Sequence, residues 1–170
     1  MKASPFHVGV AAEAFAAGQF ARFGFDVSVQ YGANQPGYDL VVSRRSGLIR
    51  VSVKGSKDGS WGLTQGHLTK GMADYHDAVD RWLDRHVGIV FCFVQFKGIA
   101  DDALPPMWLA TPDEVGRRLK ATAKGKGDTI LHVRRVWGPS AYAAGTVDEI
   151  PPSWRFTDAR ATELLDRASG

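Results

Sequence analysis

The sequence has little cysteine and no long apolar run. Cys92 is its one cysteine in 170 residues, which excludes a disulfide framework and a cysteine-rich zinc site and favours a buried structural thiol. The longest strongly apolar stretch, residues 87–96, is about half of the roughly 20 residues that span a bilayer. The N-terminus also lacks the basic-then-apolar layout of a secretory signal. We therefore expect a cytoplasmic protein without a membrane segment.

Several motifs of well-known enzyme classes are missing as well. The sequence contains no Gly-x-Ser-x-Gly nucleophile elbow, which disfavours a hydrolase with a serine-histidine-acid triad. It also has no Gly-rich phosphate loop that ends in Gly-Lys-Ser. Four histidines show no metal-ligand spacing among themselves, namely His7, His76, His86 and His132.

The residues that are present fit one ordinary globular domain. Hydrophobic residues make up 44% of the chain and charged residues 23%, which is enough apolar side chain to build a core. The formal net charge is only +3, but basic residues crowd into the stretches 44–57 and 117–135. Such stretches favour an anionic partner, although solvated faces of a helix and strands explain them equally well. The charge is therefore supporting evidence only.

Hydrophobic spacing predicts a mixed α/β domain. Helices are predicted over residues 5–23, 72–85, 111–121 and 158–167. Strands are predicted over residues 25–30, 38–43, 48–54, 87–96, 107–110 and 130–136, with the fourth strand buried on both sides. A mobile loop is predicted over residues 57–70, and loop-like chain follows residue 137.

The hairpin predicted over residues 38–54 has one apolar face and one polar face. Asp39, Ser52 and Lys54 alternate with apolar residues and therefore share the polar face. A two-residue turn at Ser46 and Gly47 would pair Asp39 directly with Lys54. Spacing alone can thus gather these three polar residues.

The order of these elements and residues resembles the PD-(D/E)XK nuclease superfamily, in its resolvase-like and homing-endonuclease-like branches. The resemblance covers about residues 5–137. It is carried by Gly9-x-x-x-Glu13, Gly37-Tyr38-Asp39-Leu40, Val51-Ser52-Val53-Lys54-Gly55-Ser56, and Met107-Trp108-Leu109-Ala110-Thr111-Pro112-Asp113-Glu114-Val115. It implies a restriction-endonuclease-like fold, with a central mixed sheet flanked by helices. We expect a nuclease domain over residues 1–137 and a C-terminal extension over residues 138–170 that packs on it.

The resemblance also implies a catalytic site. Asp39 would bind Mg²⁺ or Mn²⁺, Glu13 would supply a second carboxylate, and the backbone carbonyl of Val53 would be a further ligand. Lys54 would be the catalytic lysine beside the ion. Taken singly, Asp39 could be a turn former, Lys54 an edge-strand residue and Glu13 a solvated helix residue. Their joint occurrence in this order favours the site.

One position departs from the superfamily pattern. Ser52 stands where an acidic residue is expected two positions before the lysine, and a neutral hydroxyl is a poorer ligand for Mg²⁺ than a carboxylate. Either Glu13 supplies the missing charge, or Ser52 holds the metal through a water, or the domain has kept only binding. Two functions therefore stay open: a metal-dependent endonuclease acting on nucleic acid, DNA in the first place, and an inactive nuclease-fold domain that binds nucleic acid or a protein partner.

Eight residues are predicted to contact nucleic acid, namely Arg44, Arg45, Lys57, Gln65, Arg117, Arg118, Lys124 and Lys126. Two aromatic residues close to the first basic stretch, Tyr38 and Trp61, either stack on an unpaired base or are buried. The sequence leaves open whether the protein forms a homodimer.

Overall fold

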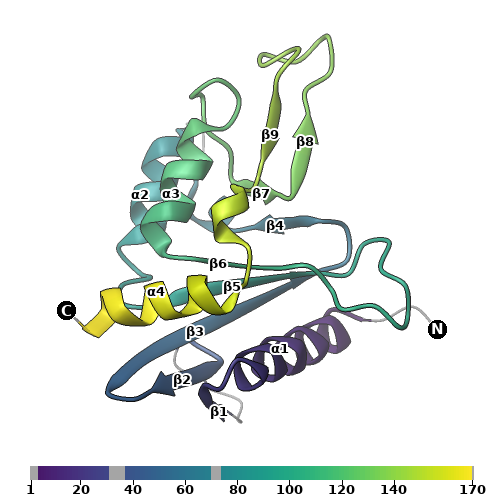
Figure 1. Ribbon diagram of the computed structural model, residues 1–170. Helices are drawn as coiled ribbons and strands as arrows, with labels where there is room; N and C mark the ends of the chain where they lie inside the picture. Colours follow the sequence, from purple (N-terminus) through teal and green to yellow (C-terminus); the bar gives the residue numbers. More distant parts are fainter. Residues whose placement is uncertain (1–3, 31–36, 70–73, 170) are drawn as a thin grey trace. The chain divides into compact units, whose positions relative to one another are not determined.

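The structure is a computed structural model that describes residues 4–30, 37–69 and 74–169 (Figure 1). The chain divides into two compact units. Unit 1 consists of Met1–Asp58, Gly88–Thr111 and Pro152–Gly170, and unit 2 consists of Gly59–Val87 and Pro112–Pro151. Each unit is described by itself. The expected division at residue 137 into a domain and an extension stays a prediction.

Unit 1 is built on a five-stranded mixed sheet. Its strands are β1 (Asp26–Val29), β2 (Leu40–Arg44), β3 (Gly47–Ser56), β5 (Val90–Gln95) and β6 (Met107–Ala110), in the order β1-β2-β3-β5-β6. β3 and β5 run parallel, whereas the other neighbours are antiparallel. All six residues of β5 are buried, as expected for a central strand. The predicted fold class, a central mixed sheet flanked by helices, is confirmed.

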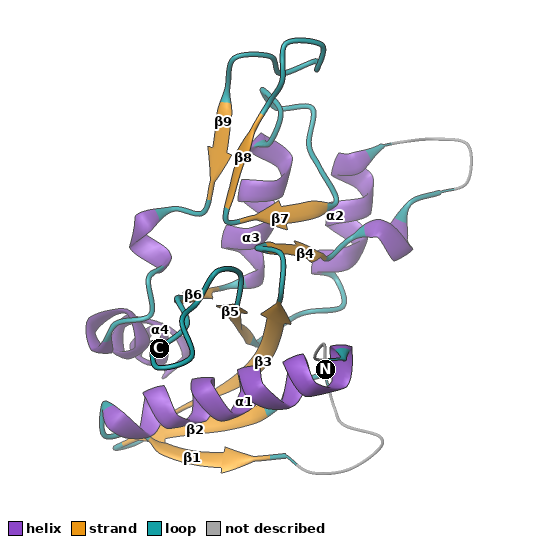
Figure 2. Cartoon of the chain, turned by 90° about the vertical axis from the view of Figure 1, so that its right-hand side faces the viewer, coloured by secondary structure: helices purple, strands orange, loops and turns teal. Residues whose placement is uncertain are grey.

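Two helices complete unit 1, α1 (Pro5–Arg22) and α4 (Asp158–Ser169). α1 lies across β1, β2 and β3 (Figure 2), and it buries Val8, Ala12, Ala16 and Phe20 at a spacing of four residues. Its alanines carry little side chain, so the helix can approach the sheet closely. α4 adds Leu164 and Leu165 to the same core.

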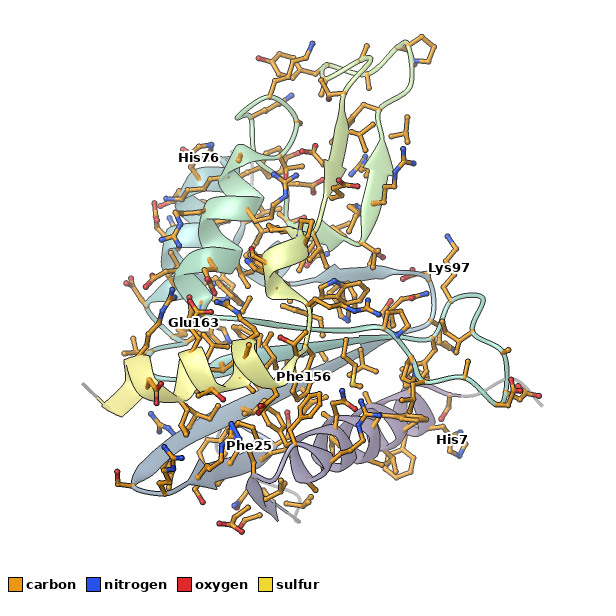
Figure 3. All side chains as sticks on the ribbon, in the orientation of Figure 1. His7, Phe25, His76, Lys97, Phe156 and Glu163 are labelled. Carbon is orange, nitrogen blue, oxygen red and sulfur yellow. The ribbon has the colours of Figure 1, made fainter. Side chains whose placement is uncertain are left out.

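Aromatic rings fill the core at the C-terminal end of α1. Phe25 and Phe156 both pack on Phe20, with ring centroids 5.7 and 4.4 Å away (Figure 3). Phe20 has no exposed surface. These contacts tie α1 to the start of β1 and to the chain that leads into α4, and so fix the helix on the sheet.

The hairpin of β2 and β3 turns one residue earlier than predicted. Arg44 pairs with Gly47, so that Arg45 and Ser46 form the turn, and Arg45 has a left-handed backbone with φ 57°. The predicted direct pairing of Asp39 with Lys54 is therefore wrong. The ladder ends where Leu40 pairs with Val51, and Asp39, one residue earlier, also donates its backbone N–H to the carbonyl of Val51. A shift of two residues keeps every side chain on its face, because side chains alternate with a period of two.

Unit 2 contains helices α2 (Tyr75–Leu83) and α3 (Pro112–Ala121), and a short helix η1 (Gln65–His67). Two strand pairs accompany them, β4 (Ser60–Gly62) with β7 (Ile130–His132) and β8 (Arg134–Val136) with β9 (Val147–Glu149). A further short helix, η2 (Pro152–Trp154), belongs to unit 1. In the described residues no helix is long and apolar enough to cross a membrane.

Two predictions fail in unit 2. The loop expected over residues 57–70 contains β4 and η1, and Trp61 is only 5% exposed and pairs with Leu131. The strand expected over residues 130–136 is divided at Val133 into β7 and β8, which pair with different partners. The backbone N–H of Val133 donates to Gly59 and its carbonyl accepts from Ile150. The bond to Gly59 extends the pairing of β4 with β7 by one residue, and the bond from Ile150 extends the pairing of β8 with β9. Val133 is therefore the point where the chain passes from one ladder to the other.

Candidate active site

Asp39 lies immediately before β2, beside the middle of β3. Its backbone N–H donates to the carbonyl of Val51 at 2.8 Å. Its carboxylate oxygen Oδ2 accepts a 2.6 Å hydrogen bond from the backbone N–H of Val53, and the Ser52 hydroxyl lies 3.5 Å from the same oxygen. The Asp39 carboxylate thus accepts the hydrogen bond of a β3 backbone N–H that lies beyond the last residue pair of β2 and β3.

Strand geometry directs the carbonyl of Val53 to the same edge. In an extended strand, a residue's N–H and C=O point to the same side of the strand. The N–H of Val53 points at the Asp39 carboxylate, so its carbonyl oxygen points toward that side as well. Two oxygen donors of different kinds, one carboxylate and one carbonyl, are therefore directed to one edge of β3.

Gly55 lets α1 approach the end of β3. A Cβ atom on Gly55 would lie 2.9 Å from Ala12 Cβ, from Val8 Cγ1 and from the carbonyl oxygen of Val8. Any side chain at this position would push the helix away. The close approach brings Ala12 against Gly55, and their sequence neighbours are Glu13 and Lys54.

The charges of this region interact. The pKa of Glu13 is raised above its ordinary value, first by partial burial, then by the negative charge of Asp39, while the positive charge of Lys54 opposes the increase. Asp39 and Lys54 are therefore close enough to Glu13 for their charges to act on it. The structure brings these three residues together, and their catalytic roles stay predictions.

Ser52 and Lys54 lie on β3 in different surroundings. Lys54 is exposed, whereas Ser52 is only 3% exposed and has its hydroxyl near Asp39. A buried hydroxyl therefore occupies the position where the superfamily pattern has an acid.

The donor set fits a hard cation in its chemistry. The described residues contain no group of three or more histidine, cysteine, aspartate or glutamate side chains arranged to hold a metal. This site has two carboxylates, Asp39 and Glu13, and Mg²⁺ is commonly held by one or two carboxylates together with the phosphates of its substrate. After burial, the negative charge of Asp39 is the second cause of the raised pKa of Glu13, and a bound cation would offset this repulsion.

The predicted nucleic-acid contacts of unit 1 differ in their surroundings. Arg44 donates to Asp158 at 2.8 Å, to Thr162 and to the carbonyl of Phe23, and its guanidinium lies 3.8 Å from the centroid of the Phe25 ring. Arg45 and Lys57 are exposed. Of the two aromatic residues, Tyr38 is half-buried with Arg50 above its ring, and Trp61 in unit 2 is buried.

The other predicted contacts lie in unit 2. Arg117, Lys124 and Lys126 are exposed, as is Gln65, whose amide lies against Gly62. Arg118 instead forms an ion pair with Asp148 in which both side chains are largely buried.

Sequence reasoning missed the role of Asp148. Its carboxylate also accepts hydrogen bonds from the backbone N–H of Ala123 at 2.9 Å and from Trp137 Nε1 at 2.6 Å. Burial raises the pKa of Asp148, but these bonds and Arg118 outweigh it, so that the pKa is lowered. An acid just after a strand start gives no local signal of these long-range bonds.

Comparison with known proteins supports the fold. No protein-family model matches the sequence, and no curated protein matches it either. Among solved structures, a bacterial homing endonuclease aligns with a TM-score of 0.51 and 15% identity over 98% of this chain and 97% of its own. The Holliday junction resolvase Hjc of Archaeoglobus fulgidus aligns with a TM-score of 0.38 and 16% identity over 62% and 78%. The second score is too low to carry an argument. The first shows that the chain has a nuclease-like α/β fold.

Proposed function

We propose that this protein is a divalent-metal-dependent nuclease that hydrolyses phosphodiester bonds in nucleic acid, DNA being the first substrate to test. The observation that carries the proposal is the placement of the Asp39 carboxylate on the N–H of Val53, while α1 packs against Gly55 next to Lys54. The raised pKa of Glu13 agrees with this placement. This chemistry requires two carboxylates and one lysine. The carboxylates would hold the cation, and the lysine would stabilise negative charge on the phosphate. The nuclease-like fold supports the proposal.

The metal ligands would be the carboxylates of Asp39 and Glu13 and the carbonyl of Val53. A bound Mg²⁺ or Mn²⁺ ion would polarise the scissile phosphate and lower the pKa of a water molecule. Asp39 is oriented for this role by the N–H of Val53, which reduces the conformational freedom of the carboxylate. Glu13 must lose its proton to act as a ligand, so its raised pKa makes ligation weaker in acid.

Lys54 would act on the substrate directly. Lys54 is exposed, and its ammonium group would stabilise the negative charge that develops on the phosphate during hydrolysis. It would also offset the repulsion between Glu13 and Asp39, because its charge lowers the pKa of Glu13.

The buried hydroxyl of Ser52 favours a second candidate function. A site with serine at the acidic position has one negative charge fewer to bind the cation. If the cation is not bound, the protein would be an inactive nuclease-fold domain that binds nucleic acid or a protein partner. Glu13 as a replacement ligand, or Ser52 acting through a water, would keep the activity. The choice among these three depends on measured metal binding.

We also propose that exposed basic side chains bind the phosphate backbone. Arg45, Lys57, Arg117, Lys124 and Lys126 are all exposed, and such residues give affinity that falls with salt. Contacts by Arg44, Gln65 and Arg118, a homodimeric state and a cytoplasmic location stay predictions.

A cleavage assay tests the proposal. Single-stranded, duplex and branched DNA and RNA are incubated with Mg²⁺, with Mn²⁺ or with EDTA, using the wild type, Lys54→Ala and the exposed-lysine control Lys97→Ala. We expect metal-dependent cleavage that Lys54→Ala lowers by about 100-fold or more and that Lys97→Ala leaves unchanged. Retained binding without cleavage of any substrate would establish the inactive alternative.

A further inference from the structure

Unit 2 contains a pocket that the proposed active site does not use. Its volume is about 430 Å³, within the range of ligand sites in proteins. The aromatic side chains of Tyr75, Trp137 and Tyr142 and the basic side chains of Lys126 and Arg135 line it. Asp128 lines it as well, so this pocket combines ring surfaces with two basic side chains and one acidic side chain.

Hydrogen bonds hold the walls of the pocket in place. The Asp148 carboxylate bonds both to the N–H of Ala123, which lines the pocket, and to Nε1 of Trp137. Gly127 allows close packing on the other side, because a Cβ there would lie 2.9 Å from Tyr75 Cβ and 3.3 Å from His76 Cδ2. His76 itself, on α2 (Figure 3), contacts the carbonyl of Gly125 at 2.9 Å. The pocket is therefore preformed rather than a gap between loose loops.

The turn after α3 is held in an unusual backbone conformation. Ala123, Lys124 and Gly125 have successive φ values of 54°, 56° and 86°, and Gly127 has φ 89°. Left-handed backbone at residues other than glycine is unfavourable, and it recurs where a protein fixes a ligand. Here it presents two lysines, Lys124 and Lys126, on one short turn, both of them exposed.

Among the described residues, one of the two basic side chains of the pocket has a carboxylate partner and the other has none. Arg135 donates to Asp128 at 2.7 Å and lies 3.8 Å from the ring centroid of Trp137. Lys126 has its ammonium 5.1 Å from the centroid of the Tyr142 ring, and in the described part of the chain no carboxylate pairs with it. One cation therefore stays available for an anion at a rim where the Tyr142 side chain is exposed.

We propose that this pocket binds an unpaired nucleotide of a nucleic-acid strand, with its base against Tyr142 and its phosphate at Lys126. An exposed ring of 68% relative accessibility beside a lysine matches the stacking surface and cation with which proteins hold single strands. A fully paired duplex keeps its bases stacked inside and cannot offer one to the pocket. The choice of nucleic acid as the partner rests on the proposed function, whereas the binding itself needs no cleavage.

The test measures affinity in EDTA, where no cleavage can occur. A fluorescein-labelled single strand of about 12 nucleotides and the same strand in a duplex are titrated with wild type, Tyr142→Ala and Tyr142→Phe. We expect Tyr142→Ala to weaken single-strand binding by about 5- to 140-fold, the range that loss of one base stack gives. Tyr142→Phe keeps the ring and should keep the affinity, and duplex binding should be the same in all three proteins.

A charge-matched pair tests the phosphate contact. Lys126→Ala should lower the slope of log affinity against log salt by about one for the single strand, because one phosphate contact is lost. Arg85→Ala removes an exposed cation of unit 2 that does not line the pocket, and it should leave the slope unchanged.

Three results would overturn the pocket proposal. They are an unchanged single-strand affinity in folded Tyr142→Ala, an equal loss for single strand and duplex, and binding of deoxyadenosine monophosphate without binding of the single strand. Asp39→Asn separates this proposal from the proposed nuclease function. Asp39→Asn should keep the Tyr142-dependent binding. If the wild type cleaves no substrate, the nuclease proposal fails, and the binding measured in EDTA still tests the pocket proposal.

Discussion

The Asp39 carboxylate accepts a 2.6 Å hydrogen bond from the backbone N–H of Val53. This bond closes a gap in the sheet, because β2 begins only at Leu40 and offers no backbone carbonyl for that donor. The same carboxylate is the proposed metal ligand. Asp39 therefore has a structural role, which is observed, and a chemical role, which is proposed, and variants can separate them.

Asp39→Ala and Asp39→Asn should differ in stability. Alanine leaves the N–H of Val53 without its partner, whereas asparagine keeps an acceptor oxygen and loses only the charge. We expect alanine to lower the free energy of unfolding by about 1–3 kcal/mol and asparagine by less. Urea unfolding in EDTA measures both, and equal stability of the two variants would show that the bond contributes little.

Ser52→Glu should restore the acid of the superfamily pattern, and Ser52→Gln is its neutral control of the same size. In EDTA, Ser52→Glu should melt below Ser52→Gln, because it adds a negative charge beside Asp39 in a position only 3% exposed. Saturating Mn²⁺ should raise the Tm of Ser52→Glu more than that of Ser52→Gln.

The size of that Mn²⁺ effect also decides between a missing and a relocated ligand. An equal rise in the two Ser52 variants indicates that Glu13 already fills the position. In that case Glu13→Gln, made in the wild-type background, should abolish the rise. If Mn²⁺ raises the Tm of none of these proteins, the metal mechanism is wrong.

Glu13 should make stability depend on pH in a defined direction. Its pKa is raised in the folded state by burial and by Asp39, so the unfolded chain loses this proton first as the pH rises. Wild-type stability from this group is complete below the ordinary glutamate pKa of about 4.5 and is lost as the pH rises through the higher folded pKa. Glutamine at this position has no proton to lose. The free energy of unfolding of Glu13→Gln should therefore increase relative to that of the wild type between about pH 4 and pH 7.

Urea unfolding in EDTA at these two pH values checks the prediction for Glu13. The stability difference between Glu13→Gln and wild type should shift in favour of the variant at the higher pH. A shift in the opposite direction would mean that the folded protein favours the ionised carboxylate. Adding Mn²⁺ at about pH 7 should favour wild type, since only an ionised Glu13 can bind the cation.

The two arginines at the β2–β3 turn should behave differently. Arg45 is exposed, and Arg45→Asn suits its left-handed backbone because asparagine tolerates that conformation. It should lower the salt slope of nucleic-acid binding by about one and leave stability unchanged. Arg44→Gln breaks the bonds to Asp158, Thr162 and Phe23 and should cost about 1–2 kcal/mol.

Salt titrations and urea unfolding of both arginine variants measure these effects. A change of salt slope in Arg44→Gln alone, with none in Arg45→Asn, would reverse the assignment.

Much of unit 1 follows from local pattern. The spacing of Val8, Ala12 and Ala16 predicts α1, and the continuous apolar run predicts β5 as a buried central strand. The hairpin register does not follow, because registers that differ by two residues pair apolar with apolar equally well. Only the backbone at Arg45 reveals which turn forms.

Unit 2 depends on contacts that no local pattern contains. β4 has three residues and gains its ladder from β7, about seventy positions later in the sequence. The break at Val133 arises from bonds to Gly59 and Ile150 rather than from any change in hydrophobic spacing. Predictions from periodicity therefore fail where short strands pair over long range.

The residues of the candidate site could be predicted from the sequence, but the contacts that position them could not. The order of Glu13, Asp39 and Lys54 along the chain pointed to a common site. Two contacts position these residues: the hydrogen bond from Val53 to Asp39, and the close packing of α1 on Gly55. A single sequence gives no sign of either contact.

The proposed nuclease function requires that Asp39 and Glu13 share one divalent cation. Crystals soaked in Mn²⁺ test it most directly, because anomalous diffraction at the manganese edge locates the ion without assumptions about activity. We expect one anomalous peak at about 2.0–2.3 Å from carboxylate oxygens of Asp39 and Glu13 and from the carbonyl oxygen of Val53, and no peak there in Asp39→Asn. Saturating Mn²⁺ that gives no peak at these residues in the wild type would contradict it.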